Sequence, residues 1–144
     1  MSDEIKKLLP HREPFLFVDS VDVNEDGTYT GYRKFTEDDF FFKGHFPDYP
    51  VVPGVILVET MAQCGGAGIG KAGLIPPGQI FFFATAEKVK FRQQVRPGDT
   101  VRVEVENMRV SKAMIKQTGK AYVGDDVAAE ATWLCLLGSA DNMK

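Results

Sequence analysis

One long apolar stretch constrains the fold of this chain more than any other feature, because residues that interrupt helices bound it on both sides. Residues 55–71 have the length of a helix, and Pro53 suits a first helical turn, where its missing N–H costs nothing. Gly73 and the Pro-Pro-Gly sequence at 76–78 end the helix. We therefore expect a long central helix around which the other elements are arranged.

Strand patterns lie on both sides of this helix. Before it, an extended segment from Phe15 to Val18, a turn at 24–27 and strand-favouring residues at 28–35 indicate a hairpin. After residue 78, turn residues separate four further strand patterns, at 80–91, 101–106, 113–123 and 127–137. The sequence predicts an α+β fold in which an antiparallel sheet curls around the central helix.

Bulk composition excludes several classes of protein. The 144 residues fit one domain, 1–144, and a content of 44% hydrophobic and 26% charged residues is typical of a globular protein. A net charge of −3 argues against nucleic acid as a general partner. Cys64 and Cys135 stand in apolar surroundings without metal-ligand spacing, so we expect core thiols, a reducing compartment and no metal site. The charged segment 1–9 is no secretory signal, which leaves the cytoplasm as the expected location.

A membrane span is a second interpretation of the central run, because residues 51–70 have about the right length. Glu59 near its middle would cost about 2.5 to 3.5 kcal/mol in the bilayer, Gln63 adds to that cost, and Pro53 shortens the usable helix. We therefore expect no membrane span. The glycines at 65–70 then indicate close approach of the helix to a sheet, to a partner subunit or to a long ligand.

A histidine and a carboxylate lie near the predicted helix start. His45 stands in a segment, 40–53, whose prolines make a regular helix or a central strand implausible. The first N–H groups of the following helix lack intrahelical partners and favour developing negative charge. Glu59, on the second turn of the helix among apolar residues, could donate a proton, while His45 is a natural base. This combination suits proton abstraction beside a carbonyl.

Each of these residues also has a simpler interpretation. His11, in Pro10-His11-Arg12, is most simply a structural histidine. Glu59 would equally fit a helix whose one wet face carries a glutamate. Spacing alone does not decide between the two interpretations of Glu59.

Several spaced motifs resemble one known family. They cover residues 8–137 in the same order and are Leu8-Leu9-Pro10-His11-Arg12, Gly44-His45-Phe46-Pro47, Pro53-Gly54-Val55, Glu59-Thr60-Met61-Ala62-Gln63, Phe83-Ala84, Lys88-Val89-Lys90-Phe91-Arg92 and Val95-Arg96-Pro97-Gly98-Asp99. The chain resembles the (3R)-hydroxyacyl-acyl carrier protein dehydratases of bacterial fatty-acid synthesis. The resemblance implies a hot-dog fold, no cofactor beyond the phosphopantetheine that carries the substrate, and a homodimer with shared active sites, usually as a trimer of dimers.

The resemblance also assigns roles to individual residues. His45 would be the catalytic base and Glu59 the acidic partner, contributed by the other protomer and acting directly or through water. A single-base scheme in which His45 makes both transfers stays open. The Gly54 N–H would polarise the thioester carbonyl, and the Val51 carbonyl would orient the imidazole. Further substrate-binding residues would be Phe46, Gln63 and Phe82, the last standing where the family often has a tyrosine beside the acyl tunnel.

The resemblance leaves related activities open as well. A glutamate at position 59 favours simple dehydration over the related dehydratase/isomerase, which usually has an aspartate there. A hot-dog acyl thioesterase would also fit the chain, and so would a non-catalytic module that binds acyl carrier protein. The basic residues that would dock acidic acyl carrier protein are Lys88, Lys90, Arg92 and Arg96, although such a cluster equally fits a solvated strand face.

Overall fold

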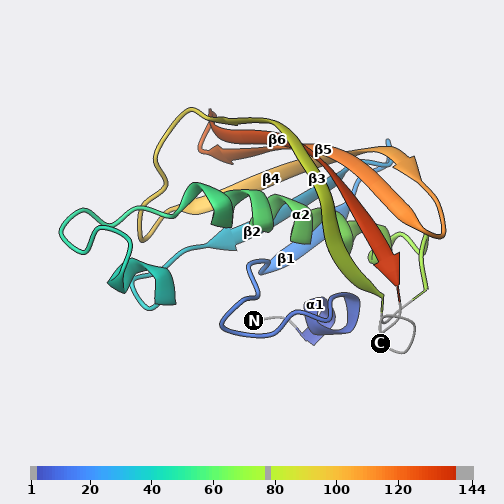
Figure 1. Ribbon diagram of the computed structural model, residues 1–144, viewed down its shortest axis with the longest axis horizontal. Helices are drawn as coiled ribbons and strands as arrows, with labels where there is room; N and C mark the ends of the chain where they lie inside the picture. Colours follow the sequence, from blue (N-terminus) through green and yellow to red (C-terminus); the bar gives the residue numbers. More distant parts are fainter. Residues whose placement is uncertain (1–2, 77–78, 139–144) are drawn as a thin grey trace.

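A six-stranded antiparallel sheet curves around one long helix in the computed structural model, which describes residues 3–76 and 79–138 (Figure 1). The elements in chain order are α1 (Asp3–Leu8), β1 (Ser20–Val23), β2 (Tyr29–Lys34), the 3-10 helix η1 (Phe40–Lys43), α2 (Gly54–Lys71), β3 (Ile80–Phe91), β4 (Thr100–Val110), β5 (Met114–Val123) and β6 (Asp126–Gly138). The predicted α+β class and the hot-dog fold are confirmed.

The strands follow the order β1-β2-β4-β5-β6-β3, and every neighbouring pair is antiparallel. This order leaves β3 at one edge of the sheet, where its only hydrogen-bonded neighbour among the described strands is β6. Since β3 follows α2 directly, the chain crosses from the helix to the far edge before returning through β4 to the middle. Both α2 and β3 therefore lie next to segments that are distant in the sequence.

The predicted elements agree with the structure in type and mostly in extent. The predicted helix, 55–71, begins one residue earlier, and Pro53 lies just outside it as the N-cap residue. Strand β3 has the predicted bounds, 80–91, and β5 and β6 match the predicted 113–123 and 127–137 to within one residue at each end. Strand β4 continues to Val110, beyond the predicted end at residue 106. Gly73 follows the helix with a φ of 74°, which glycine adopts without strain, whereas residues 77 and 78 of the predicted stop lie outside the described residues.

The N-terminal hairpin differs from the prediction in its first arm. Residues 15–18 form no strand; β1 begins at Ser20 and pairs with β2. Leu16, Phe17 and Val18 are nevertheless fully buried. This extended segment contributes its side chains to the core. Its backbone forms hydrogen bonds with the side chain of Gln63 on α2 and not with a neighbouring strand.

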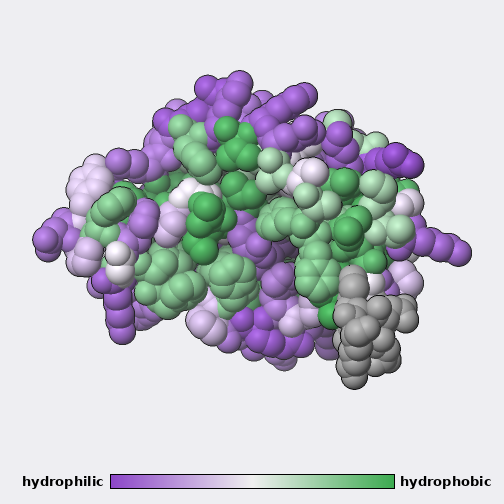
Figure 2. Space-filling view, viewed as in Figure 1, coloured by the Kyte–Doolittle hydropathy of each residue, from purple (hydrophilic) through white to green (hydrophobic). Residues whose placement is uncertain are grey.

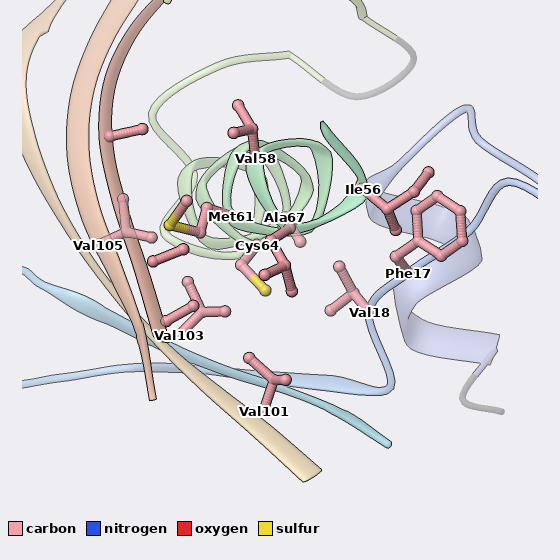
Figure 3. Close-up of a cluster of buried hydrophobic side chains, with 14 of the residues drawn as sticks. Phe17, Val18, Ile56, Val58, Met61, Cys64, Ala67, Val101, Val103 and Val105 are labelled. Atoms are coloured by element: carbon pink, nitrogen blue, oxygen red, sulfur yellow. The ribbon is translucent and has the colours of Figure 1, made fainter. Parts of the chain in front are cut away.

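The core lies between α2 and the concave face of the sheet. Met61, Cys64 and Ala67 of α2 project toward Val101, Val103 and Val105 of β4 (Figure 3). The three valines are buried, while the charged residues between them face outward, which confirms the predicted alternation with a period of two.

The glycines of α2 permit a very close approach to the sheet. A methyl group at Gly65 would collide with the amide of Gln117 on β5, and one at Gly68 would collide with the ring of Tyr29 on β2. Of the three explanations that the sequence left open, close packing on the sheet is the one seen at these two positions.

The two cysteines are buried free thiols, as predicted. Burial raises the pKa of the Cys135 thiol to about 12 and also raises that of Cys64. No helix in the described part of the chain combines the length and the apolar character that a bilayer crossing requires.

Candidate active site

The loop that carries His45 is anchored to the sheet by a buried arginine. Arg33 of β2 pairs with Asp39, just before η1, and lies 3.3 Å from Asp19. Its guanidinium also lies over the rings of Phe17 and Phe35, at 5.7 and 5.2 Å from their centroids. The prolines of 40–53 correctly excluded a strand and an α-helix, but the three phenylalanines before them form the short turn η1.

Hydrogen bonds fix both the backbone and the ring of His45. Its N–H donates to the carbonyl of Phe41 at 2.9 Å, and Nδ1 lies 3.0 Å from the carbonyl oxygen of Val51. A carbonyl can only accept, so the proton of the neutral imidazole is on Nδ1 and Nε2 is free to accept one. The structure therefore contains the predicted orienting contact from Val51.

Phe46 follows with a φ of 55°, in the left-handed region of backbone conformation, which residues other than glycine, asparagine and aspartate seldom adopt. Its ring packs against the imidazole with 4.4 Å between centroids and is 60% exposed. The unusual backbone turn and the exposed ring form one wall beside His45. Contact of Phe46 with substrate stays a prediction.

Helix α2 begins beside this histidine. Its first two intrahelical bonds run from Ile56 and Leu57 to the carbonyl of Pro53, so the N–H groups of Gly54 and Val55 precede the hydrogen-bonded turn. Gly54 lies against the ring of Phe91, and a methyl group there would come within 2.8 Å of that ring. The absence of a side chain at Gly54 therefore allows Phe91, at the end of β3, to pack directly against the start of α2.

These groups line an open groove of about 520 Å³. Its walls come from the His45 loop, the start of α2 and the end of β3 with the following residues, namely His45, Val51, Val52, Gly54, Val55, Leu57, Phe91, Arg92, Gln93, Gln94 and Val95. The groove thus combines a free imidazole nitrogen with the positive end of a helix dipole. This pairing can remove a proton and stabilise the negative charge that results.

Glu59 lies in a different place, one and a half turns along α2. Its side chain is only 18% exposed, so the interpretation as an exposed glutamate on a wet helix face is wrong. Its Oε2 accepts a hydrogen bond of 2.9 Å from Nε2 of Gln63 and lies 3.5 Å from Nε2 of His11. A small cavity of about 30 Å³ adjoins it, lined by Leu9, His11, Glu59, Ala62, Gln63, Phe81, Phe83 and Cys135.

The side-chain amide of Gln63 forms its hydrogen bonds within the protein. Its Oε1 accepts from the N–H of Phe17 at 2.7 Å, and its Nε2 donates to the carbonyl of Phe15 at 3.1 Å as well as to Glu59. Only 2% of the residue is exposed. The amide joins the extended segment 15–18 to α2 and orients the carboxylate, while the expected contact of Gln63 with substrate stays a prediction.

The His45 groove and the Glu59 cavity have no lining residue in common. Within one chain, the base and the carboxylate therefore belong to separate hollows that both border α2 and β3. Phe91 lines the first, and Phe81 and Phe83 line the second.

Phe82 does not line the Glu59 cavity, because successive residues of a strand point to opposite faces and its neighbours Phe81 and Phe83 occupy that side. Phe82 is 47% exposed. Its role beside an acyl chain stays a prediction. Sequence reasoning missed His11, Phe81 and Phe91 as parts of the two hollows, although His11 and Phe91 both fall within the spaced motifs.

The predicted basic cluster spans the end of β3, with Lys88 and Lys90 inside the strand and Arg92 and Arg96 after it. Lys88, Lys90 and Arg92 are exposed, and Arg92 lines the His45 groove. Arg92 also pairs with Glu130 at 3.0 Å and, with Lys90, lowers the pKa of that carboxyl. Arg96 stacks on the ring of Tyr49 at 4.4 Å. Arg92 therefore places one member of the cluster in the wall of the groove, and its charge is already paired with Glu130.

No group of three or more histidine, cysteine, aspartate or glutamate side chains is arranged to hold a metal ion within residues 3–76 and 79–138.

Comparison with known proteins identifies the family. The FabA-like domain family matches residues 9–132. The 3-hydroxyacyl-[acyl-carrier-protein] dehydratase FabZ of Desulforamulus reducens is 44% identical over 135 residues, which cover 93% of this chain and 94% of that protein. The chain belongs to this dehydratase family. The match includes both hollows, because His11, His45, Glu59 and Phe91 all fall between residues 9 and 132.

Solved structures of low sequence identity share the fold of this chain. A chain of the dehydratase heterocomplex ApeI:P from Xenorhabdus doucetiae superposes with a TM-score of 0.82 at 15% identity, covering 96% of this chain and 93% of that one. A mutant of the fluoroacetyl-CoA-specific thioesterase FlK superposes with a TM-score of 0.66 at 19% identity, covering 87% of this chain and 93% of the other. The same fold therefore occurs in proteins named for two different activities, so the site residues must decide between them.

Proposed function

We propose that this protein catalyses the reversible dehydration of (3R)-hydroxyacyl-[acyl-carrier-protein] to trans-2-enoyl-[acyl-carrier-protein] in fatty-acid biosynthesis. The observation that carries the proposal is the hydrogen bond from Nδ1 of His45 to the Val51 carbonyl, 3.0 Å long, beside the unpaired start of α2. It leaves Nε2 free as a base next to a site for negative charge. Membership of the dehydratase family supplies the substrate class.

The groups act in a defined order on a 3-hydroxyacyl thioester. Nε2 of His45 removes a proton from C2, and the N–H of Gly54 together with the helix dipole stabilises the charge on the thioester oxygen. The electron pair then forms the C2–C3 double bond as the C3–O bond breaks. Glu59 protonates the departing hydroxyl, directly or through water, so the products are the trans-2-enoyl thioester and water.

A complete site requires a second copy of the chain. His45 and Glu59 border separate hollows. Strand β3 runs past both of them at the edge of the sheet, where no described strand pairs with its outer side and several aromatic residues are exposed. Phe82, Phe83 and Phe91 are 47%, 44% and 54% exposed. Figure 2 shows hydrophobic side chains gathered across the face on which β3 lies. A long exposed strand edge of this kind is a template for pairing with another chain.

Antiparallel pairing of two β3 strands explains how the two hollows meet. Phe91 lines the His45 groove and Phe83 lines the Glu59 cavity. A two-fold axis near Glu87, midway between them, sets Phe91 of one copy opposite Phe83 of the other. The groove of each protomer then adjoins the cavity of its partner, and the dimer contains two equivalent sites. Three such dimers would then assemble into a trimer of dimers.

Acyl carrier protein is the proposed partner, docking at the basic cluster of Lys88, Lys90, Arg92 and Arg96. Arg92 lies both in this cluster and in the wall of the groove, so a phosphopantetheine arm entering past it would lead the thioester toward His45. The chemistry uses only side chains and backbone groups of the protein and needs no cofactor beyond the phosphopantetheine. A cytoplasmic location, where carrier-bound synthesis takes place, completes the proposal.

The decisive experiment mixes purified protein with a trans-2-enoyl thioester and follows the enoyl absorbance, with product analysis at the end. We expect reversible loss of absorbance and a 3-hydroxyacyl product. Release of free thiol would instead indicate a thioesterase, a 3-enoyl product would indicate isomerisation, and tight binding without reaction would indicate a non-catalytic module.

A further inference from the structure

His11 approaches the carboxylate of Glu59 from the segment between α1 and β1. Its Nε2 lies 3.5 Å from Oε2, the same oxygen that accepts the 2.9 Å hydrogen bond from Gln63. Both residues line the cavity beside Glu59. Two nitrogen groups from different parts of the chain thus converge on one oxygen of the proposed acid.

The backbone around His11 is held firmly by the neighbouring arginine. Nη1 of Arg12 donates to the carbonyls of Leu9 and His11 at 2.8 and 2.7 Å, and Nη2 donates to the carbonyl of Lys6 at 3.1 Å. These bonds join the end of α1 to the residue that bears the imidazole. The ring therefore meets Glu59 from a fixed support rather than from a free loop.

The protonation state of His11 follows from its surroundings. Nδ1 is buried and has no hydrogen-bond partner among the described residues, so a proton there would be a buried, unpaired donor. The neutral ring with its proton on Nε2 avoids that cost and directs an N–H toward Glu59. In addition, burial lowers the pKa of His11, the charge of Arg12 acts in the same direction, and the charge of Glu59 opposes both.

We propose that His11 is a positioning residue for Glu59, which together with Gln63 holds Oε2 by N–H groups and leaves Oε1 to exchange the proton with substrate. This inference rests on the proposed dehydratase function. No described residue donates a hydrogen bond to Oε1, which makes it the oxygen available for the reaction. The 3.5 Å separation from His11 is longer than an ordinary hydrogen bond, and such contacts in a free enzyme tighten when substrate binds.

The test compares three variants at His11 with the unaltered enzyme. His11→Gln keeps an N–H at the end of a side chain of similar reach, His11→Leu removes it, and His11→Asn keeps polarity but is too short to reach Oε2. We expect kcat to fall about tenfold in the Leu and Asn variants, with KM changed less than about twofold, and to recover in the Gln variant. Glu13→Gln, an exposed change in the same segment, is the control and should leave kcat unchanged.

A double-mutant cycle separates positioning from a purely structural role. In a Glu59→Gln background, His11→Leu should have almost no further effect on kcat, because the group that it positions has already been lost. Additive effects, equal losses in the Gln, Asn and Leu variants, or unchanged kcat in all of them would overturn the inference. If His11→Leu fails to fold, the Asn and Gln variants carry the same comparison. An unaltered enzyme without dehydratase activity would refute the proposed function instead, so the two failures are distinct.

Discussion

Replacing Gln117 with leucine should destabilise the protein through one unpaired indole group. Gln117, on β5 directly under α2, has no exposed surface and its amide makes three hydrogen bonds. Nε2 donates to the carbonyl of Gly65 at 3.2 Å and to Oδ1 of Asn107 at 2.9 Å, while Oε1 accepts from Nε1 of Trp133 at 3.1 Å. The amide therefore connects the helix to two strands.

The size of the expected loss of stability depends on which hydrogen-bond partners of Gln117 are left unpaired. Leucine has a similar volume, so the substitution leaves little cavity. The Gly65 carbonyl lies inside a helix, and Asn107 is only partly buried and keeps its hydrogen bond from Nδ2 to the hydroxyl of Tyr29, so we assign little of the cost to these two groups. Trp133 is fully buried, and its N–H would have no acceptor, which costs about 1–3 kcal/mol. We expect a loss of about 2 kcal/mol and a fall in Tm of about 4–8 °C for a chain of this size.

Denaturant and thermal unfolding at matched protein concentration measure this loss, with Gln93→Leu, an exposed change, as the control. If Gln117→Leu lowers stability no more than the control does, the argument from the unpaired indole is wrong. Because α2 bears both Gly54 and Glu59, we also expect the variant to lose activity as the helix shifts from its position on the sheet.

Four further predictions concern the site and its assembly. Glu59→Gln should lower kcat by about 10²–10⁴ in the enoyl-absorbance assay, since an amide cannot donate the proton; a loss below tenfold would contradict its role as the acid. Burial lowers the pKa of His11 below its ordinary 6.5, so the unfolded chain takes up a proton first and stability should fall as pH drops below about 6.5. Urea midpoints at pH 7.5 and 5.5 should show a smaller fall in His11→Gln, and an identical fall would refute this. Phe82→Glu should yield a monomer in light scattering, and a persistent dimer would contradict pairing through β3. Reversing the charges of Lys90 and Arg92 should raise KM about tenfold for a carrier-bound substrate but little for a short soluble thioester; equal effects on both would exclude docking at this cluster.

Local patterns were sufficient to predict the elements of this fold. The alternation at 101–106 and the helix between Pro53 and Gly73 depend on side chains within a few residues, and both are confirmed. The first arm of the N-terminal hairpin was misplaced, because Leu16, Phe17 and Val18 are buried in a segment that bonds to Gln63 of α2 and forms no strand. A buried extended segment and a buried strand look alike in a sequence, since both present apolar side chains.

The site was predictable in its members but not in its arrangement. His45 and its contact with the Val51 carbonyl followed from the motif and are present in the structure. The role of His11 could not be read from sequence, because its importance comes from a contact with Glu59 across 48 positions of the chain, and no local pattern records such a contact.

The sequence by itself determined the α+β class, the central helix and the residues with the chemistry for proton transfer, since these depend on composition and short-range order. Only the tertiary structure decided that His45 and Glu59 border separate hollows, that Gln63 is buried and fully bonded, and that β3 is an exposed edge. These facts arise from which distant segments pack together, and packing is settled by shape and burial over the whole chain.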